Sequence, residues 1–362
     1  MDRQSLKKIF GDYNPNRKEI TNDQYALRLS KLANDFNKDN DVITDDFLNE
    51  PEKVFDYLKE KPKTTSANIL YAVIGYLEAK DQDTLAKIYR LKKEMTDEGI
   101  KSDYSKKVFL GKQKDNYLPY EQVIRMVDRL DDLCDTPAKV NASHLDEWEK
   151  QEMNNVRFLF KLYLRYPKRN EFGTLKFISW MDYKKKAKLG LTENYIVMRT
   201  KHKPKLSLSD YKTSKTYGTL TYDVSDKVLK KLINQYYKEK GNGEYVFTLP
   251  KTKEPWKKYY VSQMMTKWSN RLTADVRDPP VYDGKGQPIG HKISTTLLYK
   301  IIVQEAEKKL QRSLNENDFD DAVVFNELLT DYAKIRGHHK KTQKGIYSKT
   351  LSQNPENNPP NS

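Results

Sequence analysis

The stretch that decides the fold is FKLYLRYPKRNEFGTLKFISW, residues 160–180, where the pattern changes from helical to β. A helical pattern runs from about residue 145 and ends at Pro167, because proline has no N–H for a helix interior. After it, LKFISW, NYIVMRT, KLSLSDY and GTLTYDV are typical of short strands separated by turns that carry Lys and Gly. Helical periodicity returns at SDKVLKKLINQYYKEK. The sequence therefore predicts a mainly α fold of the α+β class with a small antiparallel β meander.

The region before this switch is predicted to form a domain of its own. A polar N-terminal arm is expected over residues 1–21, and a helical domain over residues 22–112 that ends in a lysine-rich linker. Thr64–Ser66 offer N-cap chemistry for one of its helices. The buried stripe of that helix has i, i+3, i+4 and i+7 spacing: Leu70, Val73, Ile74 and Leu77.

The longer second domain is expected over residues 113–350. It opens with the helix NYLPYEQVIRMVDRLDDLCD and holds the strand region and the later helices. The last segment, LSQNPENNPPNS at 351–362, is of low complexity and is predicted to be disordered. A small helical lobe joined to a mixed lobe is suited to enclosing something long.

The charge of the chain favours a polyanionic partner. Its 66 Lys and Arg residues against 51 Asp and Glu give a formal charge of +15 and a pI near 9.3. A lysine-rich solubilising surface is the alternative explanation. The one cysteine, Cys134, excludes an internal disulfide framework and a cysteine-based zinc site.

Several other classes are disfavoured by what the sequence lacks. No apolar run reaches the length of a membrane span and the N-terminus has no signal-peptide core, so we expect an intracellular, soluble protein. There is no HExxH, Walker A or GxSxG motif. The glycines of GKGQPIG, 284–290, have the wrong spacing for a dinucleotide fingerprint and indicate a turn. We expect no cofactor, no metal and no small-molecule substrate.

Four residues stand in positions that suggest chemistry. Arg169 follows a proline at the helix-to-strand corner, and Lys212 lies in the predicted turn between two strands, where it can reach into a cleft. Taken singly, each is more simply surface charge. In RGHHKKTQKGIYSK, His338 precedes Tyr347 by nine residues, a spacing that puts both on about the same side of a helix.

In this order, an Arg corner, a hairpin Lys, a Gly-His pair and a late Tyr resemble the tyrosine recombinase (phage-type integrase) family. KPKTTSANILYAVIGYLEAK and NYLPYEQVIRMVDRL are similar to the core-binding lobe and first catalytic helix of integrases, most of all those of protist large DNA viruses, virophages and Polinton-like elements. The resemblance covers most of residues 22–350. It implies a helical core-binding domain and a catalytic domain that form a C-shaped clamp on double-stranded DNA.

The resemblance also implies a role for each of the four residues. Tyr347 would attack the scissile phosphate, and fixed cations would stabilise the transition state because tyrosine is a weak nucleophile. Arg169 would hold the non-bridging oxygens with its planar fork. Lys212 would protonate the departing 5′-oxygen, and His338 would supply a hydrogen bond or transfer a proton. The phosphotyrosine bond conserves the energy, so no ATP or obligatory metal is implied.

The family has a second arginine in an H-x-x-R box at the start of a helix, and here the matching stretch is IGHKISTTLLYKIIVQEAEKKL. In this alignment Thr296 takes the histidine position and Tyr299 the arginine position, with Lys300 as the adjacent, weaker candidate cation. Another register places a K-x-x-R at Lys309–Arg312. His291 is more simply a histidine in a turn before a helix.

Three functions follow from these observations. The first is an active recombinase that integrates or excises a viral or mobile element, working as a homo-tetramer on two DNA sites in a host nucleus or a viral replication compartment. The second is a degenerate relative that binds DNA without cutting it. The third is an unrelated basic DNA-binding protein or metal-dependent nuclease.

Overall fold

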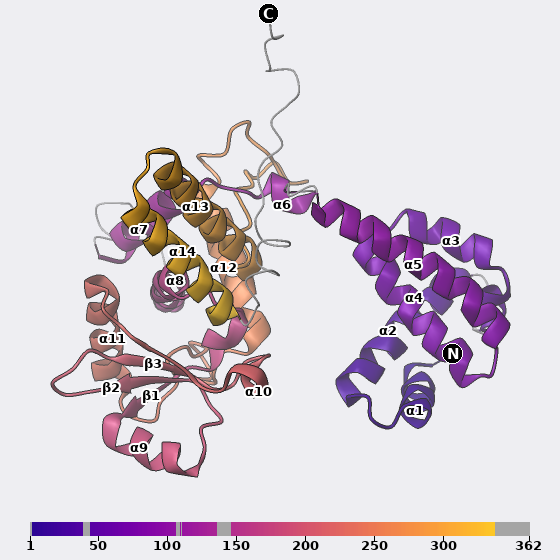
Figure 1. The fold of residues 1–362 in the computed structure, drawn as a ribbon, viewed down its shortest axis with the longest axis horizontal. Helices are drawn as coiled ribbons and strands as arrows, with labels where there is room; N and C mark the ends of the chain where they lie inside the picture. Colours follow the sequence, from indigo (N-terminus) through magenta and orange to yellow (C-terminus); the bar gives the residue numbers. More distant parts are fainter. Residues whose placement is uncertain (1, 39–43, 106–108, 110, 136–145, 337–362) are drawn as a thin grey trace, which may run out of the picture. The chain divides into compact units, whose positions relative to one another are not determined.

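The computed structural model describes residues 2–38, 44–105, 109, 111–135 and 146–336. The chain divides into two compact units, an N-terminal unit at Met1–Lys106 and a C-terminal unit at Lys107–Ser362 (Figure 1). The N-terminal unit contains α1 (Arg3–Tyr13), α2 (Glu19–Phe36), the 3₁₀ turn η1 (Asp46–Asn49), α3 (Pro51–Lys59), α4 (Lys63–Ala79) and α5 (Asp83–Ser105).

Helix α4 is the centre of the N-terminal unit. The predicted stripe is confirmed, since Leu70, Val73, Ile74 and Leu77 are all buried. The predicted cap is wrong, because α4 begins at Lys63 and Thr64–Ser66 already lie in its first turn. Ser66 instead donates a hydrogen bond of 2.9 Å to the carbonyl of Leu58, which joins α4 to the end of α3.

The polar arm expected over residues 1–21 is replaced by structure, because residues 3–13 form α1. Leu6 and Phe10 are four residues apart, so they share one face of the helix, and both are buried in the core of the unit. Asp2 caps the helix by accepting hydrogen bonds from the backbone N–H groups of Gln4 and Ser5. Ile9, which packs against the same core, and Tyr13 complete an i, i+3, i+4 and i+7 pattern with Leu6 and Phe10, a helical signal that the prediction of a polar arm overlooked.

The C-terminal unit surrounds one large hydrophobic core. Its elements before the last strand are α6 (Lys112–Asp115), α7 (Tyr120–Asp135), α8 (Glu147–Arg165), η2 (Asn170–Thr174), β1 (Lys176–Ser179), α9 (Trp180–Leu189), β2 (Tyr195–Met198), β3 (Lys205–Leu208) and α10 (Ser214–Tyr217). The remaining elements are β4 (Leu220–Asp223), α11 (Lys227–Lys240), α12 (Lys258–Thr273), α13 (Thr295–Asn315) and α14 (Phe319–Arg336). The four predicted strands are thus confirmed, among helices on both sides in sequence.

The sheet has the strand order β1-β2-β3-β4 and is mixed rather than antiparallel throughout. The meander is confirmed for β2, β3 and β4, whereas β1 pairs parallel with β2. A turn cannot make a parallel connection, and α9 makes the crossover here. Ser179 caps α9 by accepting a hydrogen bond from the N–H of Asp182, and Gly190 ends it with a positive φ. The prediction of a plain turn missed this cap.

Strand alternation divides the sheet between two layers. Phe177 and Ile196 belong to the main core, whereas Ile178 and Val197 form a smaller cluster with Tyr183 of α9. Figure 1 accordingly shows α9 on the opposite side of the sheet from α8, α13 and α14. The sheet therefore packs against helices on both faces.

The turn predicted at residues 284–290 is confirmed, with Gly286 at φ +75° and a bridge between Tyr282 and Pro288. Gly290 then passes close to the end of α12. A Cβ at Gly290 would overlap the carbonyl oxygen of Asn270 and lie 2.5 Å from Thr273 Oγ1. This close approach fixes the segment that leads into α13.

We predict that Gly290→Ala lowers the free energy of unfolding by about 2–3 kcal/mol, because the added methyl group has to push apart a helix end and a loop. Gly284→Ala is the matched control, since nothing lies within 4 Å of a Cβ at that position. Chemical denaturation of both variants measures the difference. Equal stability of the two would contradict the close approach.

Candidate functional site

The helix-to-strand corner around Arg169 is built by the end of α8. Helix α8 stops at Arg165, before Pro167, and η2 begins at Asn170 with Arg169 as its N-cap residue. The hydroxyl of buried Tyr163 donates a hydrogen bond to the carbonyl of Arg169. Burial raises the pKa of Tyr163 well above its ordinary value, so this hydroxyl stays a donor. Arg169 itself is half-buried on a fixed backbone.

Lys168, the neighbour of Arg169, is buried at 1% exposure. Its Nζ lies 3.6 Å from the ring centroid of Tyr211, a close cation–π contact, and makes no hydrogen bond among the described residues. Burial lowers the pKa of Lys168 to about 8; the charge of Glu171 opposes this shift, whereas the charges of Arg169 and Arg336 add to it. The corner thus concentrates positive charge around one buried carboxylate.

Lys212 is exposed in the turn between β3 and β4, as the sequence predicted. The start of the turn is fixed by buried Asn194, whose Oδ1 accepts 2.9 Å hydrogen bonds from the N–H groups of Ser209 and Asp210. Its end is fixed by Tyr211, whose hydroxyl donates to the carbonyl of Gly218 at 2.7 Å. Lys212 is therefore an exposed side chain on a hydrogen-bonded turn, and it follows in sequence Tyr211, whose ring Lys168 contacts.

Arg336 is the last residue of α14, and sequence reasoning gave it no role. Its Nη1 donates to the carbonyl of Lys168, its Nη2 donates to Thr296 Oγ1 at 3.0 Å, and its Cζ lies 4.7 Å from the ring centroid of Tyr299. Thr296 and Tyr299 are the two residues aligned above with the H-x-x-R box. A guanidinium from another helix therefore lies against the residue aligned with the arginine. The sequence feature that could have drawn attention to Arg336 is its position directly before Gly337-His338.

The start of α13 is joined to the same corner. Thr295 Oγ1 donates a hydrogen bond of 2.8 Å to Asn170 Oδ1, next to Arg169 in the chain. Ser294 caps α13 by accepting from the N–H of Leu297. Four segments are thus joined by these contacts: the α8 corner, the β3–β4 turn, the start of α13 and the end of α14.

The other candidate cations lie elsewhere. Lys300 is buried and its Nζ donates to Gln113 Oε1 in α6 at 2.6 Å. Arg312 is exposed and its Nε donates to Glu316 at 2.9 Å, so the alternative K-x-x-R register falls on a solvated helix end. His291 follows the turn, as expected, and its backbone N–H donates to Thr273 Oγ1. Burial is the main cause that lowers the pKa of His291.

His338 and Tyr347 lie outside the described residues, as do Gly337 and His339. Among the described residues, no group of three or more His, Cys, Asp or Glu side chains is arranged to hold a metal ion. Nor does the described part of the chain contain a helix that is long and apolar enough to cross a membrane.

No family model matches the sequence, and no curated protein matches it. Among solved structures, the fold is similar to the crystal structure of XerA recombinase, with a TM-score of 0.34 and 12% identity. That similarity covers 98% of this chain and 95% of the other. At this identity and score it assigns neither a reaction nor a site residue.

We predict that stability rises with pH in a way that depends on Lys168. The folded pKa of about 8 lies below the ordinary value of 10.5, so the folded state releases the proton first and gains stability between these pH values. The gain is about 3 kcal/mol. In Lys168→Met it should vanish, as measured by urea unfolding at pH 7 and pH 10 against the wild type.

Lys188→Met, on the exposed part of α9, is the control for losing a lysine. If Lys168→Met and Lys188→Met show the same change in stability with pH, Lys168 is not the buried cation described above.

Proposed function

We propose that the protein is a tyrosine-type DNA recombinase that cuts and rejoins duplex DNA through a 3′-phosphotyrosine intermediate. One observation carries the proposal: Lys168 contacts Tyr211, and Arg336 binds the carbonyl of Lys168. Lys168 precedes Arg169, Tyr211 precedes Lys212, and Arg336 precedes Gly337-His338. Three segments that are far apart in sequence are therefore in contact next to the candidate residues. A phosphate-transfer site requires such a gathering of cations.

In the proposed reaction, the hydroxyl oxygen of Tyr347 forms a bond to the scissile phosphorus as the bond to the 5′-oxygen breaks. The tyrosine proton leaves to a base near the phosphate, a role open to His338, and Lys212 gives a proton to the 5′-oxygen. Arg169 binds the non-bridging oxygens in bidentate fashion. Attack by a 5′-hydroxyl on the phosphotyrosine reverses these steps and rejoins the DNA.

Arg336 supplies the second guanidinium charge in this proposal. Its bonds to Thr296 and to the carbonyl of Lys168 hold it at the start of α13, from which its charge acts on the phosphate. A charge that is fixed in place stabilises a transition state without any cost of reorganisation. As a buried residue at 4% exposure, Arg336 also positions the corner that carries Arg169.

The second candidate function is DNA binding without cleavage. Thr296 and Tyr299 carry no charge at the start of α13, and Lys300 is held by Gln113. Loss of one transition-state cation costs about a hundredfold in rate. A relative in which Arg336 only positions the corner would bind DNA and leave it intact.

The rest of the proposal concerns the assembly. The helical N-terminal unit and the C-terminal unit, as the proposed catalytic domain, would close as a clamp on double-stranded DNA, mainly through contacts with the DNA backbone. A homo-tetramer on two DNA sites would exchange strands and so integrate or excise a viral or mobile element. In that setting the protein would act in a host nucleus or a viral replication compartment.

The test is the covalent adduct between protein and DNA. A suicide duplex, nicked just 3′ of the candidate scissile phosphate so that the short fragment with the new 5′-hydroxyl is lost, leaves the phosphotyrosine trapped, and a denaturing gel detects it. We predict an adduct with the wild type and none with Tyr347→Phe, because the phenolic oxygen is the nucleophile.

Tyr259→Phe, an exposed tyrosine of α12, is the matched control and should give the wild-type yield. Absence of any adduct while DNA binding persists would favour the non-cleaving function. An adduct that survives in Tyr347→Phe would overturn the assignment of the nucleophile.

A further inference from the structure

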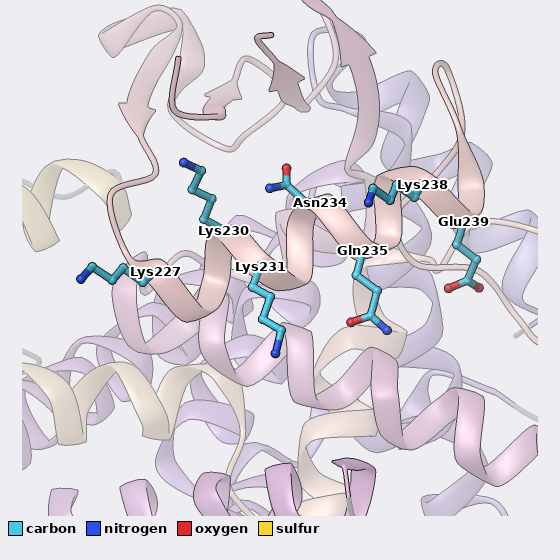
Figure 2. Close-up of a pocket in the computed structure, with 7 residues that line it drawn as sticks. All are labelled: Lys227, Lys230, Lys231, Asn234, Gln235, Lys238 and Glu239. Carbon is cyan, nitrogen blue, oxygen red and sulfur yellow. The ribbon is translucent and has the colours of Figure 1, made fainter. Parts of the chain in front are cut away.

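Helix α11 presents an exposed cationic face to solvent. Its apolar face, which includes Leu229, Ile233 and Tyr236, is buried in the core of the C-terminal unit. The opposite face lines an open hollow of 730 Å³ (Figure 2). The residues that line this hollow are Lys227, Lys230, Lys231, Asn234, Gln235, Lys238 and Glu239.

Three of the four lysines, Lys227, Lys230 and Lys231, do not stabilise the helix that carries them, whereas Lys238 stands in the last turn, where the helix dipole favours a cation. Lys227 and Lys230 stand near the N-terminus of α11, where the helix dipole disfavours cations. Lys227 and Lys231 are a like-charge i, i+4 pair, which is also unfavourable. The described residues include no carboxylate within 4.0 Å of any of the four lysine ammonium groups. The positions of Lys227, Lys230 and Lys231 are therefore not explained by folding stability.

The first turn and the ion pairs of α9, in the same unit, differ from those of α11. Asp182 is in the first turn of α9, and Lys186 and Lys188 are in its last turn, as the dipole favours. Lys185 pairs with Asp182 at 3.6 Å, and Lys186 pairs with Glu193 at 3.2 Å. High lysine content alone thus does not dictate an unpaired face, and α11 is a distinct case.

We propose that the α11 face, defined as Lys227, Lys230, Lys231, Asn234, Gln235 and Lys238, binds the phosphate backbone of duplex DNA. From Lys227 to Lys238 the helix rises about 16 Å, a length of duplex axis that holds about five phosphates of one strand. Lysines at this spacing neutralise phosphates as point charges, and the two amides add neutral hydrogen-bond donors. Neither group reads sequence, so the contact is independent of the target site.

This surface is separate from the Arg169–Lys212 corner. In Figure 1, α11 lies at the left of the sheet and α10, which follows Lys212, lies at the right. The face would therefore hold a DNA segment other than the phosphate proposed to react. The inference does not require the chain to cleave DNA.

The experiment measures DNA affinity as a function of salt in the full chain. The α11 variant carries Lys227→Gln, Lys230→Gln and Lys231→Gln, and the probe is a labelled duplex of about 30 base pairs, followed by anisotropy. The slope of log K against log salt is negative, and each lost phosphate contact reduces its magnitude by about 0.9. The magnitude of the slope is therefore expected to decrease by about 2 to 3, and the affinity at low salt should fall at least about tenfold.

The matched control is a triple change on α9, Lys184→Gln, Lys185→Gln and Lys188→Gln, which removes the same charge from the same unit. It should leave the slope nearly unchanged. The melting temperature of the α11 variant should hold or rise, because like-charge repulsion is relieved. A single Lys230→Gln variant should reduce the magnitude of the slope by about 0.9.

Three outcomes would overturn the inference. One is an unchanged slope in the α11 variant. Another is an equal loss in the α9 control, which would mean that net charge alone is responsible. The third is weaker binding of polyglutamate with unchanged binding of DNA, which would assign the face to an acidic protein. The adduct assay does not enter into these outcomes, so the recombinase proposal can fail or succeed independently.

Discussion

The interaction on which the site depends is the bonding of the Arg336 guanidinium to the carbonyl of Lys168 and to Thr296. It joins the end of α14 to the α8 corner and to the start of α13. Lys168 extends the connection to the β3–β4 turn through its contact with Tyr211. A buried guanidinium with several planar donors suits this task, because a single side chain bonds acceptors from separate elements. These contacts join the residues next to Arg169 and Lys212 in the chain, in addition to the hydrogen bonds that Tyr163 and Asn194 make there.

This connection is electrostatically costly in the absence of an anion. Lys168, Arg169 and Arg336 are cations, and buried Glu171 opposes their effect on the pKa of Lys168. Burying like charges together is unfavourable unless a counter-charge arrives. A phosphate at the corner would supply that charge, so the burial that lowers the pKa of Lys168, together with the charges of Arg169 and Arg336, would also favour anion binding.

Much of the fold could be predicted from local patterns. Proline cannot continue a helix interior, so Pro167 marked the end of α8, and strand alternation after Leu175 located all four strands. Helix α9 was missed because its lysines give no apolar periodicity. The available signals were the N-cap residue Ser179 and the C-cap residue Gly190. For the site, the sequence placed Arg169 at a corner and Lys212 in a turn. The role of Arg336 could not be predicted, because its partners are set by how α13 and α14 pack.

The most direct test is to replace Arg336 and measure both stability and reaction. Arg336→Gln should lower the free energy of unfolding by about 2–3 kcal/mol, since buried acceptors lose their donors. At a temperature where the variant is folded, its adduct should form about a hundredfold more slowly. Arg312→Gln, which loses one exposed ion pair, should match the wild type in both respects. If Arg336→Gln were as stable and as reactive as Arg312→Gln, the central role of Arg336 would be contradicted.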